Sequence, residues 1–597
     1  MKYNRKTKQS ESWITNIIRF QLLVFVVAGL LASCAKQGFP SGGPKDTDPP
    51  VVKGVSPASQ TTNYTANKFR IDFDEYVTIK DADNNVLISP PMATKPEYST
   101  KGHSVIVKIK DTLQSNTTYL FQFKGAIVDF NEGNPLPSFE YVFSTGEALD
   151  SMTISGRVID ALTHQPPSTN ISVLAYEMAT IADTVGDSLI AKQQPTYQTR
   201  ISSSGEFQLN YLRPGSYKII AIEDVDRNLK YTATEAIAWL DTTVTSWGMP
   251  KSPKQDTIKT EPMDTASLPY VPDSLKEATE APHQPIELLL SQKATAAQRV
   301  LNSTFTSRGC LQVITQSPME NPVVTADSVI WKLSKNRDTI LLWTLRQTRD
   351  SVYMVLSDSA TALNDTLTIK YRETKKSKRL FGKSNQESQE VNKLQSLIGA
   401  THPYYDTMSV SFSVPIDRDV LDSLTLMNLG DSTLGYAQAI LDSVRTLARI
   451  IPYETLKQGE KYKLQIPANI CRDLFGRPND SLVVTTTITK AEDYGMISID
   501  LVNLPSSKGG FLLQLLTDKG DIVRQLPVTA GTLQFINLQP ATYRLRLIDD
   551  RNGDREWTPG DYYRHEQPEA VYYYTKSLQL RANWEMAETW EVEASAQ

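Results

Sequence analysis

The stretch Phe69-Arg-Ile-Asp-Phe-Asp74 places apolar and charged residues at alternate positions along the chain. Successive side chains of a β-strand point to opposite faces, so one face of this strand is expected to be buried and the other exposed to water. Further runs of strand-forming residues follow at Val105–Ile109, Tyr119–Phe123 and Phe139–Phe143, separated by Asn, Gly and Pro turns. This spacing is typical of a β-sandwich over residues 48–146.

The length and composition of the chain narrow its class. At 597 residues it is too long for one hydrophobic core, and roughly 100–200 residues per domain gives about three to five domains in series. Val-, Ile- and Thr-rich runs recur, and the five His residues provide few general bases. The net charge of −5 provides no basic surplus for phosphates, which argues against nucleic acid as a partner. The expected fold class is all-β, with β-sandwich modules in tandem and a flexible linker.

The N-terminus carries an export signal. A basic start that includes Lys2 and Arg19 precedes the apolar run Phe20–Leu31, and small residues and a Cys follow. This run is shorter than the ~20 residues that span a membrane, so we expect residues 1–33 to be a signal peptide. The stretch Leu31-Ala-Ser-Cys34 resembles the lipobox of bacterial lipoproteins, which implies cleavage before Cys34 and a covalent lipid on its thiol.

The residues after the lipobox determine how the protein is held. Residues 34–47 are rich in Gly, Pro, Lys and Asp and are expected to form a flexible tether. Each buried CH₂ of an acyl chain contributes ~0.8 kcal/mol, so several chains on Cys34 hold the protein firmly to a membrane. Ala35 resembles the sorting pattern of outer-membrane lipoproteins in Gram-negative bacteria. We expect a lipid anchor in the outer membrane, facing either the periplasm or the cell surface.

Four segments of the first sandwich resemble one known family. The segments are the opening Asp48–Val52, the stretch Leu113–Tyr119, the turn Asp129–Asn134 and the closing Phe143–Gly146. Together they resemble the bacterial Ig-like domain of the S-layer (SbsA) type. The resemblance implies a scaffold module and names no ligand.

A second kind of module follows, and it occurs twice. Residues 152–247, through Gly205–Tyr217, resemble the carboxypeptidase-regulatory or prealbumin-like β-sandwich. The same pattern returns at an offset of 326 residues, without a gap, and predicts a second copy over 495–597. An Ig-like partner is expected at 399–492, where Leu456–Tyr462 resembles the earlier segment that ends at Tyr119. The chain is therefore interpreted as a tandem duplication.

Three segments separate these modules. Residues 248–285 are rich in Pro, Lys, Asp, Glu and Thr and are predicted to be a disordered linker that permits hinge motion. Residues 286–372 contain several strand patterns and are predicted to form a β-rich middle module of no recognised family. Residues 373–398 form a basic and polar connection. The whole arrangement resembles the Ig-like-domain lipoproteins of Bacteroidetes.

Two Asp-rich loops are the candidate metal sites. The later loop places oxygen-bearing side chains at positions 1, 3, 5, 7 and 12 of a calcium-binding pattern, namely Asp550, Asn552, Asp554, Glu556 and Asp561. The earlier loop is the weaker candidate, with Asp224, Asp226, Asn228 and Glu235 at positions 1, 3, 5 and 12. Such hard oxygens suit structural Ca²⁺, but Asp and Asn are also what tight turns prefer.

Other candidate features leave alternatives open. Cys310 and Cys471 form a possible disulfide pair, and buried free thiols are the other interpretation. The aromatic residues near the C-terminus are expected either to fill the sandwich core or to form a sugar-stacking face; they are Tyr572, Tyr573, Tyr574, Trp584 and Trp590.

The functional expectation follows from what the sequence contains and lacks. It has no Gly-x-Ser-x-Gly elbow, no His-Glu-x-x-His helix, no phosphate-binding Gly-x-x-x-x-Gly-Lys loop and no Cys-x-x-Cys pair, so we expect no enzyme. The leading hypothesis is a lipid-anchored envelope scaffold or adhesion module whose partner is another envelope protein or a glycan. The alternative is a polysaccharide-binding accessory lipoprotein of an outer-membrane uptake complex.

Overall fold

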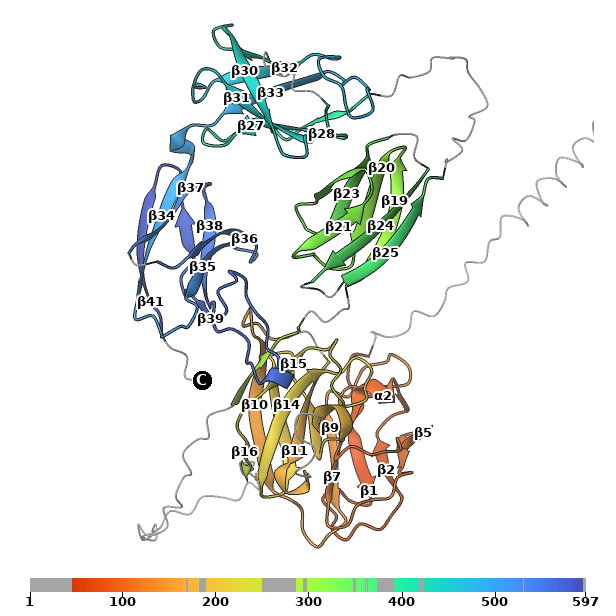
Figure 1. The fold of residues 1–597 in the computed structure, drawn as a ribbon. Coiled ribbons are helices and arrows are strands. Elements are labelled where there is room, and N and C mark those ends of the chain that lie inside the picture. Colours follow the sequence, from red (N-terminus) through yellow and green to blue (C-terminus); the bar gives the residue numbers. More distant parts are fainter. Residues whose placement is uncertain are drawn as a thin grey trace, which may run out of the picture. The chain divides into compact units, whose positions relative to one another are not determined.

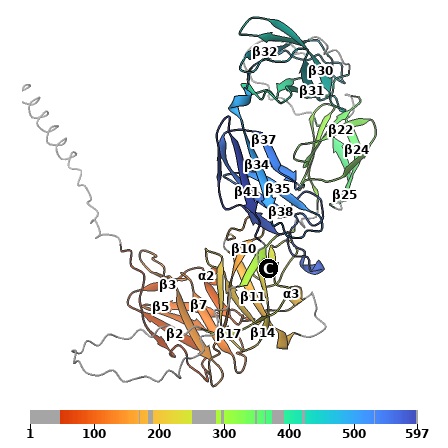
Figure 2. The same cartoon turned by 90° about the vertical axis from the view of Figure 1, so that its left-hand side faces the viewer.

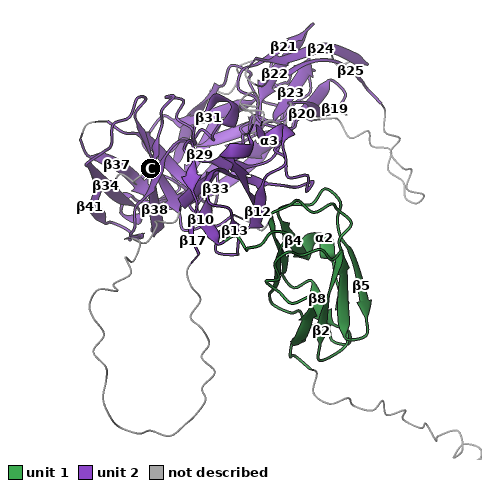
Figure 3. Cartoon of the chain, turned by 90° about the horizontal axis from the view of Figure 1, so that it is seen from below, with its two compact units in different colours: residues 1–150 green, residues 151–597 purple. Residues whose placement is uncertain are grey.

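The computed structural model describes residues 46–593 apart from 168–169, 182–188, 250–285, 294–297, 347–349, 360, 362, 373–390, 418–423 and 530. Strands dominate every coloured part of the ribbon (Figures 1 and 2), and the expected all-β fold class is confirmed. The chain divides into two compact units, Met1–Asp150 and Ser151–Gln597 (Figure 3). None of the helices in the described part combines the length and apolar composition of a membrane span. The expected signal peptide, Cys34 and most of the tether lie outside the described residues.

The described part of the first unit, residues 46–150, is called the Ig-like module. Its sheets have the strand orders β1-β2-β6-β5, β4-β7-β9 and β3-β8, and one short helix, α2 (Ala82–Asn85), accompanies them. Phe69, Ile71 and Phe73 are buried, which confirms the alternation predicted for β2. The strands are β1 (Val52–Ser56), β2 (Lys68–Phe73), β3 (Val77–Ile79), β4 (Val86–Ser89), β5 (Glu97–Lys101), β6 (Ser104–Lys108), β7 (Thr118–Phe123), β8 (Ile127–Asp129) and β9 (Phe139–Ser144).

The first repeat module comprises residues 151–293 and contains two sheets around one core. In the first sheet β10 pairs with β13, β17 and β18; the second has the order β12-β11-β14-β15, with β16 also on β14. Its helical turns are η1 (Met178–Thr180) and α3 (Leu189–Lys192). The strands are β10 (Met152–Asp160), β11 (Ile171–Glu177), β12 (Tyr197–Arg200), β13 (Glu206–Leu212), β14 (Ser216–Glu223), β15 (Ile237–Trp239), β16 (Val244–Thr245), β17 (Trp247–Gly248) and β18 (Ile286–Leu290).

Strand β18 corrects the predicted domain boundaries. It pairs in parallel with β10 from Gly156 to Asp160, and Leu288 is fully buried in the core of the first repeat module. The assignment of Ile286–Leu290 to the middle module is therefore wrong. Strands β17 and β18 both pair with β10, so residues 250–285, which lie outside the described residues, connect two strands of one module rather than two halves of the chain.

The second repeat module comprises residues 494–593 and repeats the topology of the first, apart from β17, which has no counterpart among its described strands. Its sheets have the orders β37-β34-β41 and β36-β35-β38-β39, with β40 also on β38, and β41 is parallel to β34 just as β18 is parallel to β10. The turn η3 (Ala491–Asp493) precedes the module, and η4 (Tyr562–Arg564) lies within it. The strands are β34 (Gly495–Val502), β35 (Phe511–Thr517), β36 (Ile522–Pro527), β37 (Leu533–Leu538), β38 (Ala541–Asp549), β39 (Val571–Tyr573), β40 (Leu578–Leu580) and β41 (Glu585–Glu591).

Two further modules lie between the repeats in sequence. The middle module has sheets β19-β20-β23-β22 and β21-β24-β25, and the eight-stranded module has one sheet of order β26-β28-β31-β30-β29-β32-β33-β27. The middle strands are β19 (Val300–Ser307), β20 (Cys310–Thr315), β21 (Pro322–Ala326), β22 (Val329–Leu333), β23 (Thr339–Thr344), β24 (Ser351–Asp358) and β25 (Leu363–Lys370). The others are β26 (Leu394–Ser396), β27 (Thr401–His402), β28 (Ser409–Phe412), β29 (Leu424–Asn428), β30 (Leu434–Leu441), β31 (Leu447–Pro452), β32 (Lys461–Ile466) and β33 (Leu482–Ile488). Because β26 begins at Leu394, the predicted boundary at residue 399 is too late.

Tyrosine hydroxyls support the interpretation as a duplication. Tyr119 accepts a hydrogen bond from the Gln114 N–H (2.9 Å), and Tyr462 accepts the equivalent bond from Lys457 (2.9 Å). In the two repeat modules, Tyr217 and Tyr543 each donate instead to the carbonyl four residues earlier, at 2.8 and 2.6 Å. Each hydroxyl satisfies a backbone group at a turn, as the tyrosine corner does in other sandwiches.

The two cysteines are both free and buried. Burial raises the pKa of each thiol, that of Cys471 to about 11. Cys310 packs with Trp343 and Val414 where the middle module contacts the eight-stranded module, and Cys471 belongs to the core of the latter. The interpretation as buried thiols therefore holds, and the disulfide alternative does not.

Most of the C-terminal aromatic residues pack in or against the sandwich core, which agrees with the first of the two interpretations given for them. Trp590 is buried in the core of the second repeat module, and Tyr572 and Tyr574 pack against that core. Tyr573 lies on the opposite face, as alternation along β39 requires. Trp584 is about half exposed and lies beneath the Arg581 guanidinium.

Candidate functional site

Both Asp-rich loops begin where a central strand ends. The earlier loop follows β14 and the later one follows β38, and the strand residues Ile222 and Ile548 are fully buried. A buried strand end fixes the first carboxylate of each loop, so Asp224 and Asp550 are both only 6% exposed. A carboxylate in such a place needs hydrogen-bond donors or a cation.

The earlier loop wraps its own backbone around two buried carboxylates. Asp224 accepts N–H bonds from Asn228 (3.0 Å) and Leu229 (3.3 Å). Glu235 is also buried and accepts N–H bonds from Val225 (3.1 Å) and Thr232 (2.9 Å). These four bonds draw the two ends of the loop together.

A third carboxylate completes a compact oxygen cluster in the earlier loop. Asp224, exposed Asp226 and Glu235 each offer an oxygen, and the three atoms lie within 4.8 Å of one another. The pKa of Asp224 is raised, chiefly by burial and further by the charges of Glu235 and Asp226, against the lowering effect of the backbone donors. Like charges held this close favour a hard cation between them.

The sixth position of calcium-binding loops is normally Gly, which adopts a left-handed backbone conformation. In both loops of this protein that position keeps the left-handed conformation but is occupied by another residue. Leu229 and Arg555 occupy the sixth position of the two loops, and both have left-handed φ values, 58° and 66°. A side chain at such a φ is strained relative to Gly. The loop geometry is therefore imposed by the carboxylate hydrogen bonds rather than by a permissive residue.

The later loop closes on a residue that the sequence pattern did not assign. Asp550 accepts N–H bonds from Gly553 (2.8 Å) and Arg555 (3.1 Å). Glu569, 2% exposed, accepts N–H bonds from Arg551 (2.8 Å) and Thr558 (2.9 Å), which are the counterparts of the donors to Glu235. Glu569 thus takes the role that the pattern gave to Asp561.

Asp561 and Glu556 are corrected accordingly. Glu556 is exposed, and Asp561 caps η4 by accepting a bond from the Tyr563 N–H (3.2 Å) and pairs with Lys293 (2.5 Å). Among the described residues, the later loop forms no group of three clustered carboxylates like that of the earlier loop. The preference for the later loop is therefore not supported. A sequence signal for Glu569 existed, because Glu235-Ala-Ile237 recurs as Glu569-Ala-Val571.

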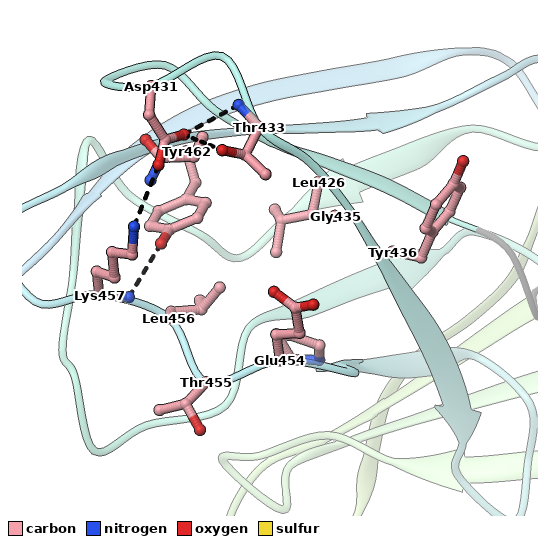
Figure 4. Close-up of a pocket in the computed structure, with 12 residues that line it drawn as sticks. Leu426, Asp431, Thr433, Gly435, Tyr436, Glu454, Thr455, Leu456, Lys457 and Tyr462 are labelled. Carbon is pink, nitrogen blue, oxygen red and sulfur yellow. Dashed lines mark hydrogen bonds and ion pairs between the residues drawn. The ribbon is translucent and has the colours of Figure 1, made fainter.

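A shallow hollow of about 80 Å³ lies on the eight-stranded module (Figure 4). Lys457 pairs with Asp431 (3.1 Å) at one side, and Glu454 also lines the hollow. Tyr436 lines it too and is half exposed, and its carbonyl accepts the N–H of the exposed Tyr453. The volume is well below the ~300–1,000 Å³ of typical small-molecule pockets.

One family model matches part of the sequence. This family model describes a bacterial Ig-like domain, and it matches residues 46–145. The Ig-like module is therefore similar to bacterial Ig-like domains. This finding agrees with the expected Ig-like resemblance for that module. No curated protein matches the sequence.

Solved structures resemble the chain weakly. The N-terminal part of the bacterial S-layer protein SbsC is similar over 26% of this chain and 40% of its own length, at 16% identity and a TM-score of 0.16. The Bacillus anthracis TIE protein is similar over 92% of this chain and 76% of its own, at 9% identity and a TM-score of 0.13. BcpA, the major pilin subunit of Bacillus cereus, is similar over 74% and 99%, at 8% identity and a TM-score of 0.13. The Ig-like assignment rests on the family match and the strand pairing.

Replacing Glu569 tests the corrected loop. Glu569→Ala leaves the partly buried N–H groups of Arg551 and Thr558 without their acceptor and is expected to lower the free energy of unfolding of the second repeat module by about 2–4 kcal/mol. Glu556→Ala, the matched exposed control, should stay within about 0.5 kcal/mol. Hydrogen exchange of β38 and β39 peptides at rising urea concentration measures both. Equal effects would contradict the assignment of Glu569.

Proposed function

We propose that this protein is a non-enzymatic scaffold or adhesion protein of the bacterial envelope, held to the outer membrane by lipid on Cys34. The observation that carries the proposal is the series of β-sandwich cores, the first of which is similar to bacterial Ig-like domains. Its partner is an envelope protein or a glycan. The lipobox resemblance of Leu31–Cys34 supports the anchor.

Replacing Cys34 tests anchoring and orientation together. Wild type should fractionate with the outer membrane and incorporate radiolabelled palmitate, whereas Cys34→Ala should lose the label and leave that fraction. Cys310→Ala is the control, because a buried thiol is no acylation site and the variant should keep its label. A Cys34→Ala variant that keeps label and fraction would refute the anchor. Protease digestion of intact cells then distinguishes surface display from a periplasmic orientation.

A second candidate is the polysaccharide-binding accessory lipoprotein. One observation favours it: Tyr436 and Tyr453 are exposed residues on neighbouring strands, joined by a backbone hydrogen bond (3.0 Å), and Tyr436 lines the hollow together with Glu454. Adjacent exposed aromatic rings beside polar groups suit sugar stacking. This role requires surface display, so protection from protease on intact cells would remove it.

We also propose that the earlier loop binds Ca²⁺ as a structural ion. Asp224, Asp226 and Glu235 supply the clustered carboxylate oxygens, and their close approach without a cation is unfavourable. The ion would offset that repulsion and stiffen the connection between β14 and β15. It would take no part in catalysis.

Calcium titration of the melting temperature tests this site. With a Kd on the order of 10⁻⁴–10⁻³ M, as in extracellular modules, 10 mM Ca²⁺ should stabilise the first repeat module by about 1.4–2.7 kcal/mol. Asp224→Asn should abolish the shift, and Asp554→Asn in the later loop should leave it intact. If Asp554→Asn abolishes the shift and Asp224→Asn does not, the later loop is the site and the proposal fails.

A further inference from the structure

The second repeat module carries an insertion that the first lacks. From Phe207 and Leu533, in β13 and β37, to Ile222 and Ile548, near the ends of β14 and β38, equivalent residues are 326 positions apart. From Ile237 and Val571, where β15 and β39 begin, to Val244 and Leu578 they are 334 positions apart. The later loop therefore contains eight additional residues, and η4 lies in this longer loop. The gapless alignment expected from the sequence is corrected here.

The η4 turn places one tyrosine in the first repeat module. Tyr562 is 2% exposed and belongs to a cluster with Leu174, Ile220 and Trp239 from β11, β14 and β15. Its ring meets the Trp239 ring edge to face, with centroids 5.5 Å apart, and the Lys218 ammonium lies 5.1 Å from its centroid. A buried aromatic anchor of this kind is typical of the centre of a stable interface.

Polar contacts surround the anchor. The Gly560 N–H donates to Ser291 Oγ (3.0 Å), and the Gln567 side chain donates to the Trp239 carbonyl (3.3 Å). Asp561 pairs with Lys293 (2.5 Å). A Cβ at Gly560 would lie 2.8 Å from the Trp239 ring, so Gly is required for this approach. These groups form a polar rim around an apolar centre.

A separate contact joins the same two modules. The Tyr573 hydroxyl donates to the Leu162 carbonyl (2.8 Å), and the Tyr573 ring lies 5.4 Å from the His164 ring. Leu162 packs with Ile548 and Val571 of the second repeat module. The interface therefore extends beyond the insertion.

The two copies differ at the face that Tyr562 covers. By strand pairing, Leu174 and Ile220 of the first module correspond to Gln514 and Arg546 of the second. Gln514 and Arg546 hydrogen-bond to each other (2.8 Å), so the second copy satisfies this face with its own polar side chains. The first copy is apolar there and needs a cover. The insertion and the apolar face are thus complementary differences between two copies of one module.

We propose that the Tyr562 turn is an intrachain lock that fastens the second repeat module onto the apolar outer face of the first. The occupant of this face is the chain's own residues 560–567. The two copies are connected along the chain by the middle and eight-stranded modules. The lock adds a direct side-chain contact between them. It adds to the proposed scaffold role and does not depend on the anchor, the calcium ion or any ligand.

Hydroxyl-radical footprinting of the full chain tests the lock. Tyr562→Ala should raise the oxidation rate of Trp239, which is 3% exposed in the intact protein, severalfold. Tyr563→Ala, the adjacent control whose ring is half exposed, should change it little. Trp590, buried in the core of the second repeat module, reports whether that module stays folded and should remain protected.

Each outcome decides the proposal. Unchanged protection of Trp239 in Tyr562→Ala would overturn it. If Trp590 is oxidised as well, Lys293→Glu replaces the test, because it sets a carboxylate against Asp561 outside the apolar cluster: selective oxidation of Trp239 supports the lock, and no change overturns it. If dilution of the wild-type protein exposes Trp239 to oxidation, the Tyr562 turn that covers it belongs to a second copy of the chain. That result would also overturn the intrachain lock.

Discussion

Each repeat module depends on the return of its last strand to its first. Strand β18 lies parallel to β10, and β41 lies parallel to β34, although the connection before β18 is far longer than the one before β41. The returning strand carries apolar residues into the core, Leu288 and Leu290 in one copy and Trp590 in the other. Because a parallel strand cannot be supplied by a hairpin, the chain must leave the sheet and come back.

This pairing changes the mechanical interpretation of the chain. A linker between two halves would let them move about a hinge. Residues 250–285 are instead flanked by β17 and β18, which both pair with β10, so this segment leaves and re-enters the same module rather than joining two halves. The second repeat module then contacts the first through Tyr562 and Tyr573, which lie in or next to the longer loop of the later copy. Duplication followed by divergence at one face accounts for both the similarity and the contact.

Sequence patterns predicted what depends on neighbouring residues. The alternation at Phe69–Phe73, the paired tyrosines at 119 and 462, and the repeat at 217 and 543 all reflect local pairing or turn bonds. The same sequence patterns did not predict features that depend on residues far away in the chain. Ile286–Leu290 looks like the start of the next module, because nothing in the run itself indicates that its partner is β10. Asp561 aligned with Glu235 only because an acidic residue stands at the same offset, and the buried Glu569 lies eight positions further on. The burial of Tyr562 depends on a face of another module, so no local pattern predicts it.

Cleavage within residues 250–285 tests the central claim most directly. A site-specific protease sequence is placed in this segment of a Tyr562→Ala variant. This variant lacks the tyrosine ring through which the second repeat module packs against the first. After cleavage, the account predicts that the two pieces stay together in native size-exclusion chromatography, because β18 remains paired with β10 in a shared core. Adding Leu288→Asp, which puts a charge into that core, should release them. Separation of the pieces without Leu288→Asp would contradict the account and restore residues 250–285 as a linker between independent halves.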